Sequence, residues 1–95
     1  MITFEDLKFE TYDANQLRVG KYARIQFENG YGASVVSHNF SYGGKSGLYE
    51  LAVLENDDIT YKTPITDDVL GFLTPSEVSD ALISIQSLEK SLLTQ

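Results

Sequence analysis

The sequence predicts an α+β fold: a four-stranded, mostly antiparallel sheet in meander order, with one C-terminal amphipathic helix packed on one face. Two observations support this prediction. Segments that alternate apolar and polar residues, or that are continuously apolar, lie between turn residues within positions 7–62. The last third changes to a helical period after a capping signal at Thr74-Pro75-Ser76-Glu77. We expect a single domain over residues 1–95, because this length suits one hydrophobic core.

The candidate strands lie at about residues 7–12, 20–28, 32–38, 48–55 and 58–62. The first two alternate apolar and polar side chains, as half-buried strands do. Asn29-Gly30 tolerates positive φ at both positions, so we expect a type I′ hairpin turn between the second and third strands. Leu48 to Leu54 is apolar except for Glu50, which favours a central strand buried on both faces. Pro64 is expected to stop the last strand, since proline lacks a backbone N–H.

The helix is expected over about residues 75–92, after a single helical turn from Thr66 through Leu70. Thr74 is the expected N-cap, Pro75 takes the first helical position, and Glu77 completes a capping box. An apolar stripe then recurs at helical spacing; its members are Val78, Ala81, Leu82, Ile85, Leu88 and Leu92. We expect this stripe to bury itself on the sheet and to supply much of the core.

The composition argues against several function classes. The chain has no cysteine, which excludes a disulfide framework, a thiolate zinc site and a cysteine nucleophile. The net charge is −7 and the seven Lys and Arg residues are scattered, which argues against direct nucleic-acid binding. The first residues are acidic where a secretory signal is basic, and no apolar run reaches the length of a membrane span. We therefore expect a cytoplasmic protein without membrane contact.

Three motifs invite a chemical interpretation, and each has a simpler explanation. Gly44-Lys45-Ser46 matches the end of a phosphate-binding loop, but the upstream glycine of that loop is Asn39 here and no helix follows. His38 is the only histidine, without an evident partner for acid–base chemistry, and an ordinary strand-end or loop histidine is the alternative. Asp57-Asp58 and Asp67-Asp68 lack calcium-loop spacing, so turn and capping roles explain them. We predict no enzyme, no cofactor and no metal.

Two surfaces remain as candidate binding sites. The loop from His38 to Tyr49 mixes aromatic residues with Gly and Ser, as many protein-binding surfaces do. Its candidate contact residues are His38, Phe40, Tyr42, Lys45 and Tyr49. The alternative is that Phe40 or Tyr42 folds back onto the sheet edge.

The second candidate is an acidic face, because the charge is unevenly distributed. Residues 1–54 carry six acids and five bases, whereas residues 55–95 carry eight acids and two bases. The candidate acidic residues are Glu55, Asp57, Asp58, Asp67, Asp68, Glu77 and Asp80. Such a face could imitate the phosphates of a nucleic acid and occupy a basic groove. The alternative is a solvated surface that keeps the protein soluble.

Residues 28–90 also carry a resemblance. It rests on Glu28 to Val36, Ser41-Tyr42-Gly43-Gly44, Gly47 to Leu54, and Thr63 to Thr74 leading into the helix. These stretches resemble small uncharacterised orphan proteins of tailed bacteriophages and prophages. The resemblance implies a phage-encoded accessory protein made in the cytoplasm of an infected bacterium. Such proteins have no assigned activity, so it transfers no functional residue.

One main hypothesis and two alternatives follow. The main hypothesis is a small, acidic, non-enzymatic binding module, phage-encoded, that engages an unidentified host or phage protein. The first alternative is a nucleic-acid-mimicking inhibitor of a basic nucleic-acid-processing protein. The second is a small virion or assembly component. The sequence leaves the oligomeric state open.

Overall fold

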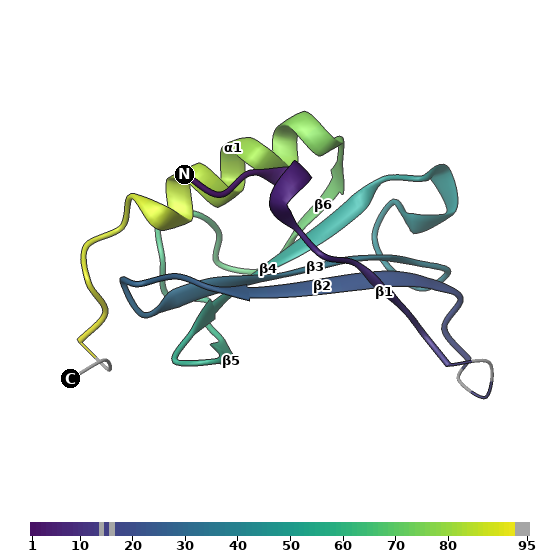
Figure 1. The fold of residues 1–95 in the computed structure, drawn as a ribbon, viewed down its shortest axis with the longest axis horizontal. Helices are drawn as coiled ribbons and strands as arrows, with labels where there is room; N and C mark the ends of the chain where they lie inside the picture. The colour runs from purple at the N-terminus through teal and green to yellow at the C-terminus, as the bar shows by residue number, and fades with distance from the viewer. Residues whose placement is uncertain (14, 16, 93–95) are drawn as a thin grey trace.

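The computed structural model describes residues 1–13, 15 and 17–92. Within them the chain forms two 3₁₀ turns, six strands and one α-helix (Figure 1). In chain order these are η1 (Phe4–Asp6), β1 (Glu10–Thr11), β2 (Gly20–Gln26), β3 (Tyr31–His38), η2 (Gly44–Ser46), β4 (Tyr49–Glu55), β5 (Asp58–Ile59), β6 (Leu70–Leu73) and α1 (Pro75–Gln86). The α+β class with an antiparallel sheet and a C-terminal helix is confirmed, but the described sheet has six strands rather than four.

The sheet runs as a meander from β1 to β5, and β6 then returns to pair with β4. All pairs are antiparallel. β4 has β3 along one edge, while β5 and β6 share its other edge, opposite Leu54–Glu55 and Tyr49–Leu51 respectively. β4 is therefore internal, as expected. Its residues 51–54 are all buried, which explains why this strand is apolar on both faces.

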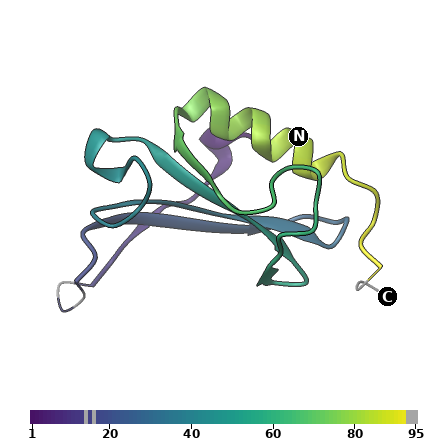
Figure 2. The same ribbon diagram turned by 180° about the vertical axis from the view of Figure 1, so that it is seen from behind.

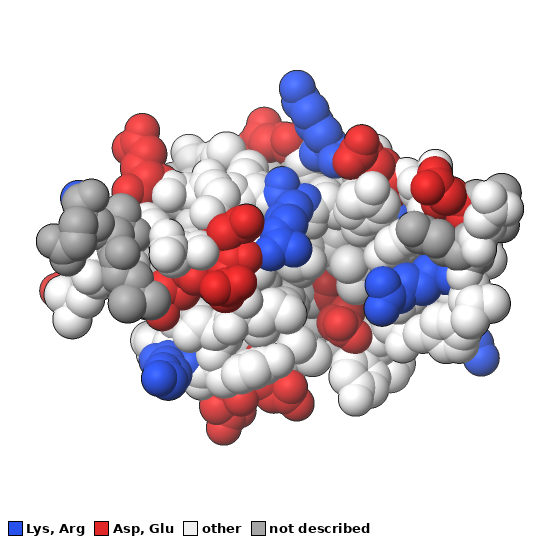
Figure 3. Space-filling view, turned by 90° about the horizontal axis from the view of Figure 1, so that it is seen from below, with Lys and Arg blue, Asp and Glu red and all other residues white. Residues whose placement is uncertain are grey.

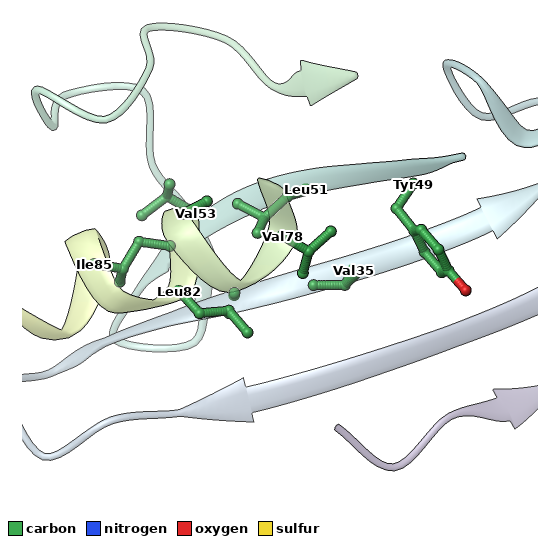
Figure 4. Close-up of a cluster of buried hydrophobic side chains, with 9 residues drawn as sticks. Val35, Tyr49, Leu51, Val53, Val78, Leu82 and Ile85 are labelled. Carbon is green, nitrogen blue, oxygen red and sulfur yellow. The ribbon is translucent and has the colours of Figure 1, made fainter. Parts of the chain in front are cut away.

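The helix α1 covers one face of the sheet and carries the core (Figures 1 and 4). Its buried residues Val78, Ala81, Leu82 and Ile85 pack against Ala33 and Val35 of β3 and Tyr49, Leu51 and Val53 of β4. This arrangement follows from the two periods, because every third or fourth helical residue meets every second strand residue. None of the helices among the described residues has both the length and the apolar character needed to cross a bilayer.

The start of α1 is as predicted, but its end is not. Glu77 N–H donates to Thr74 Oγ1 at 3.2 Å, and Thr74 N–H donates to Glu77 Oε1 at 3.0 Å, which completes the capping box. The helix ends at Gln86 rather than near residue 92. The Asn29 side-chain amide donates to the carbonyls of Ile85 (2.9 Å) and Leu88 (3.1 Å). These are carbonyls that a longer helix would have bonded internally.

As a result, the two last members of the predicted apolar stripe differ from the others. Leu88, just beyond the helix, is half-buried and packs against the core. Leu92 is 88% exposed and contributes nothing to the core. The stripe that buries the helix therefore ends at Ile85.

The hairpin between β2 and β3 is present, but its turn is not type I′. Gly30 has a φ of 88°, whereas Asn29 is not left-handed. Gly30 N–H donates to the Phe27 carbonyl (3.2 Å) and Phe27 N–H donates to the Tyr31 carbonyl (2.8 Å). These bonds describe a type I turn followed by a glycine bulge. Asn29 is held by its bonds to the helix end and to Tyr31 N–H, so its side chain fixes the turn.

The type I′ turn lies instead between β4 and β5. Asn56 and Asp57 have φ values of 52° and 71°, and they form the two-residue loop between the paired Glu55 and Asp58. This hairpin curls below the sheet, on the face that α1 leaves uncovered (Figure 1). There the Arg24 side chain of β2 donates to the Asp57 carbonyl at 2.6 Å. Leu54 of β4 pairs with Ile59 of this hairpin and is fully buried.

Three predicted elements at the sheet edges are shorter or different. Pairing at 7–12 is limited to Glu10–Thr11, because the preceding chain leaves the sheet to pack on α1, where Phe4 N–H donates to Ser79 Oγ. The strand at 58–62 is limited to Asp58–Ile59. No helical turn forms at 66–70; the segment after β5 rises toward α1 (Figure 2) and then forms β6. β6 forms because Leu70 and Leu73 gain burial by pairing with β4.

Candidate protein-binding surface

The structure separates the five predicted contact residues into two groups. Phe40 (67% exposed), Tyr42 (60%) and Lys45 are on the surface, so neither aromatic ring folds back onto the sheet edge. Tyr49 is only 6% exposed and belongs to the core, which corrects its assignment to a binding loop. It lies on the helix side of β4, where its ring is 5.0 Å from that of Phe4. Strand alternation placed it there, because Leu51 and Val53 share that face.

His38 is also buried, at 9% exposure, at the end of β3. Its ring lies 5.5 Å from that of Tyr12 and 6.4 Å from that of Phe40. Its Nδ1 accepts a hydrogen bond from Phe40 N–H at 3.1 Å. Burial lowers the pKa of His38, Arg18 lowers it further, and Glu50 opposes both. His38 is therefore a strand-end histidine that supports the loop from behind rather than a contact residue.

The sequence-based prediction missed Phe72, which the structure places beside Tyr42. Leu70 pairs with Leu51 and Leu73 with Tyr49, so β6 has one more residue in this stretch than β4 and forms a bulge. Within the bulge Phe72 has a φ of 55°, and its side chain is 61% exposed. A glycine inside a short apolar run, here Gly71, is a known sequence signal for a bulge, and it could have indicated this feature.

Two hydrogen bonds hold the backbone of Tyr42, one to the bulge and one to a side chain of β4. Phe72 N–H donates to the Tyr42 carbonyl at 3.1 Å, and Tyr42 N–H donates to Glu50 Oε1 at 2.9 Å. A Cβ atom on Gly71 would lie 2.6 Å from the Tyr42 Cβ, so a glycine is required where the loop meets β6. The bulge and the loop thus hold two exposed aromatic side chains, Tyr42 and Phe72, next to each other.

These two aromatic residues line a shallow hollow of about 320 Å³. The other lining residues are small or polar: Asn39, Ser41, Gly43, Lys45 and Ser46. Lys45 is the only charged residue among these described lining residues. The hollow therefore offers apolar walls and one positive charge.

Asn39 connects the hollow to two more exposed apolar residues in the segment just before β2. Its backbone N–H donates to the Val19 carbonyl (3.2 Å), its Oδ1 accepts from Val19 N–H (2.8 Å), and its Nδ2 donates to the Leu17 carbonyl (3.2 Å). Leu17 is 85% exposed and Val19 is 73% exposed.

We call this surface the apolar end, and its members are Leu17, Val19, Phe40, Tyr42 and Phe72, with Lys45 beside them. It occupies the end of the molecule at which η2 lies, on the right in Figure 1. Half of the ten most exposed large hydrophobic side chains of the described residues gather there. Single exposed hydrophobic residues are common on soluble proteins, whereas a group of them on one surface often marks an interaction site.

The seven predicted acidic residues do not come together in the same way. Asp57 Oδ1 is 3.4 Å from Arg24 Nε, and Glu55 accepts a hydrogen bond from Ser91 Oγ at 2.5 Å. Glu77 is engaged in the capping box, and Asp80 lies beside it along the same hollow on α1. The remaining three are exposed: Asp58 in β5, and Asp67 and Asp68 in the loop before β6.

The charge pattern on the uncovered sheet face is mixed. Figure 3 shows acidic side chains interspersed with Lys and Arg over this face. A phosphate-like array needs a continuous run of one sign. The charges on this face therefore do not support the hypothesis of nucleic-acid mimicry. Among the described residues, no group of three His, Cys, Asp or Glu side chains is placed to hold a metal ion.

Comparison with protein-family models, with curated proteins and with solved structures finds no match for this chain. Its function must therefore be inferred from its own geometry.

Proposed function

We propose that this protein is a small, non-enzymatic binding module that docks a protein partner on the apolar end. The observation that most supports this is the conformation of Phe72. A left-handed backbone costs a residue other than glycine roughly 1–2 kcal/mol, and the Phe72 side chain, 61% exposed, recovers little of that by burial. Exposed strain of this kind is typical of positions at which the aromatic side chain meets a partner.

The hollow indicates what the partner presents. Tyr42 and Phe72 supply rigid contact area with few rotatable bonds, and the small polar residues around them supply adaptable hydrogen bonds. Lys45 favours a negative group next to the apolar one. We therefore propose a partner segment that places an apolar side chain between the two rings and a carboxylate near Lys45. From the sequence resemblance, we further propose that the module is phage-encoded and that the partner is a host or phage protein.

The test compares three proteins in affinity capture from bacterial lysate, followed by measurement of Kd for the captured partner. They are the natural chain, Phe72→Gly, and the matched control Tyr61→Ser, which removes an aromatic ring that is 52% exposed after β5, away from the apolar end. We expect Phe72→Gly to weaken binding about 30-fold, the scale of a hot-spot residue. Tyr61→Ser should bind like the natural chain.

Stability measured on these proteins and on one further variant, Phe72→Ala, separates binding from folding. Phe72→Gly removes the left-handed strain, so we expect it to be more stable to urea than Phe72→Ala by about 1 kcal/mol. Loss of partner in a variant that folds well would assign the side chain to recognition. Equal affinity of all three capture proteins would contradict the proposal.

A further inference from the structure

The turn that presents Phe40 depends on an acceptor nitrogen of His38. Phe40 N–H donates to His38 Nδ1 at 3.1 Å, and Ser41 closes the same turn, its Oγ accepting from His38 N–H and donating to the His38 carbonyl, both at 2.9 Å. A side chain that accepts from the N–H two residues later resembles an Asx turn, in which an asparagine oxygen has this role. The acceptor exists only while Nδ1 carries no proton.

We propose, on the basis of the function proposed for the apolar end, that acidification releases this turn and withdraws Phe40 from the binding surface. A proton on Nδ1 turns the acceptor into a donor that faces the Phe40 N–H. The buried ring also has little water to take over the lost bond, since it is packed between Tyr12 and Phe40. Release of residues 38–41 then loosens the neighbouring contacts of Asn39 with Val19, just before β2.

The surroundings of the ring determine the pH at which this happens. The charged and titratable groups that face the His38 ring are Arg18, two residues before β2 in the chain, Glu50 of β4 and the phenol of Tyr12. Burial and Arg18 lower the pKa of His38, and Glu50 raises it. The net direction is downward from 6.5, so the turn is held at neutral pH and is released in mild acid.

Nuclear magnetic resonance of the full chain between pH 8 and pH 5 tests this directly. The measurements are the ¹⁵N shifts of the His38 ring and the exchange protection of the Phe40 amide, normalised to the intrinsic exchange rate. We expect an unprotonated Nδ1 at pH 8. We expect the protection to fall about two- to tenfold as the ring titrates, as for the loss of one hydrogen bond.

Two variants distinguish the acceptor from the ring. His38→Asn replaces Nδ1 with an oxygen that accepts but does not titrate, so protection should persist without pH dependence. His38→Phe keeps an aromatic ring without an acceptor, so protection should be low at every pH. A protonated Nδ1 at pH 8, or the same pH response in His38→Asn as in the natural chain, would overturn the proposal.

These measurements need no partner, so their failure leaves partner docking on the apolar end intact. If instead Phe72→Gly binds as well as the natural chain, the docking surface is wrong even where the turn is seen to respond to pH.

Discussion

At the scale of single residues, Asn29 forms hydrogen bonds to more parts of the structure than the Asn-Gly motif alone predicts. Its Nδ2 donates to carbonyls at the end of α1, its Oδ1 accepts from Tyr31 N–H, and its own carbonyl accepts from Ser91 N–H. The β2–β3 turn, the helix end and the C-terminal segment therefore meet at one residue, the first two through its side chain and the third through its backbone carbonyl. Asn-Gly alone predicts a hairpin, and it did so correctly, but the tertiary role of the amide changed the turn type.

This role can be tested with Asn29→Asp. The substitution removes the amide donor and places a carboxylate against helix carbonyls, where the helix dipole is also negative. We expect the free energy of unfolding to fall by about 2–3 kcal/mol, as when buried acceptors lose their partner. Urea unfolding followed by circular dichroism measures it. Glu28→Gln, an exposed change in the same turn, should stay within about 0.5 kcal/mol; an equal effect of both substitutions would refute the role given to the amide.

At the scale of elements, what the sequence predicted well is what local physics decides. The capping box, the buried face of α1 and the internal position of β4 follow from side-chain period and hydrogen-bonding groups near in sequence. The strand β6 does not, because Leu70 to Leu73 is four residues long and bulged, and only β4 makes it a strand. The same distinction applies to the candidate surface. Loop composition indicated Phe40 and Tyr42 as surface residues, whereas the burial of Tyr49 and the exposure of Phe72 depend on strand pairing.

The helix face offers a sharp test at this scale, because two neighbouring residues point in different directions. Leu82 is fully buried, whereas Ile83 is 39% exposed. Leu82→Asp would bury a carboxylate and lose the apolar contacts of the core, at a cost above about 4 kcal/mol, so we expect the domain to unfold. Ile83→Asp places the same weak helix former at the next position, where the side chain is partly exposed, and this variant should stay folded. Thermal melting followed by circular dichroism compares them, and a Leu82→Asp variant with native stability would refute this packing.

At the scale of the whole molecule, titration of a few groups defines the pH range of greatest stability. The pKa of His38 is lowered by burial, and that of Glu77 is lowered by its hydrogen bonds in the capping box. At both groups, the folded state binds a proton less readily than the unfolded chain does. The stability that these groups contribute is complete above 6.5 for His38 and above 4.5 for Glu77, and it is lost as the pH falls through each folded pKa.

The alkaline side has the opposite sign. Burial raises the pKa of Tyr12 and Tyr31 above 10.0, with Glu55 adding to the effect at Tyr31. Here the folded state holds its protons longer than the unfolded chain, so the contribution is complete below 10.0 and is lost as the pH rises through the folded pKa.

We therefore expect the urea midpoint to be highest between about pH 7 and pH 9 and to fall on both sides. Urea titrations at unit steps from pH 4 to pH 11, at constant ionic strength, measure this curve. His38→Asn should flatten the fall between pH 7 and pH 5, and Tyr31→Phe should flatten the fall above pH 10, because each removes one group with a shifted pKa. Constant ionic strength matters because the net charge of −7 adds a general self-repulsion that salt screens. A midpoint that rises steadily from pH 7 to pH 5 would show that relief of this repulsion outweighs the titration of His38, and the assignment of the acid limb to that residue would be wrong.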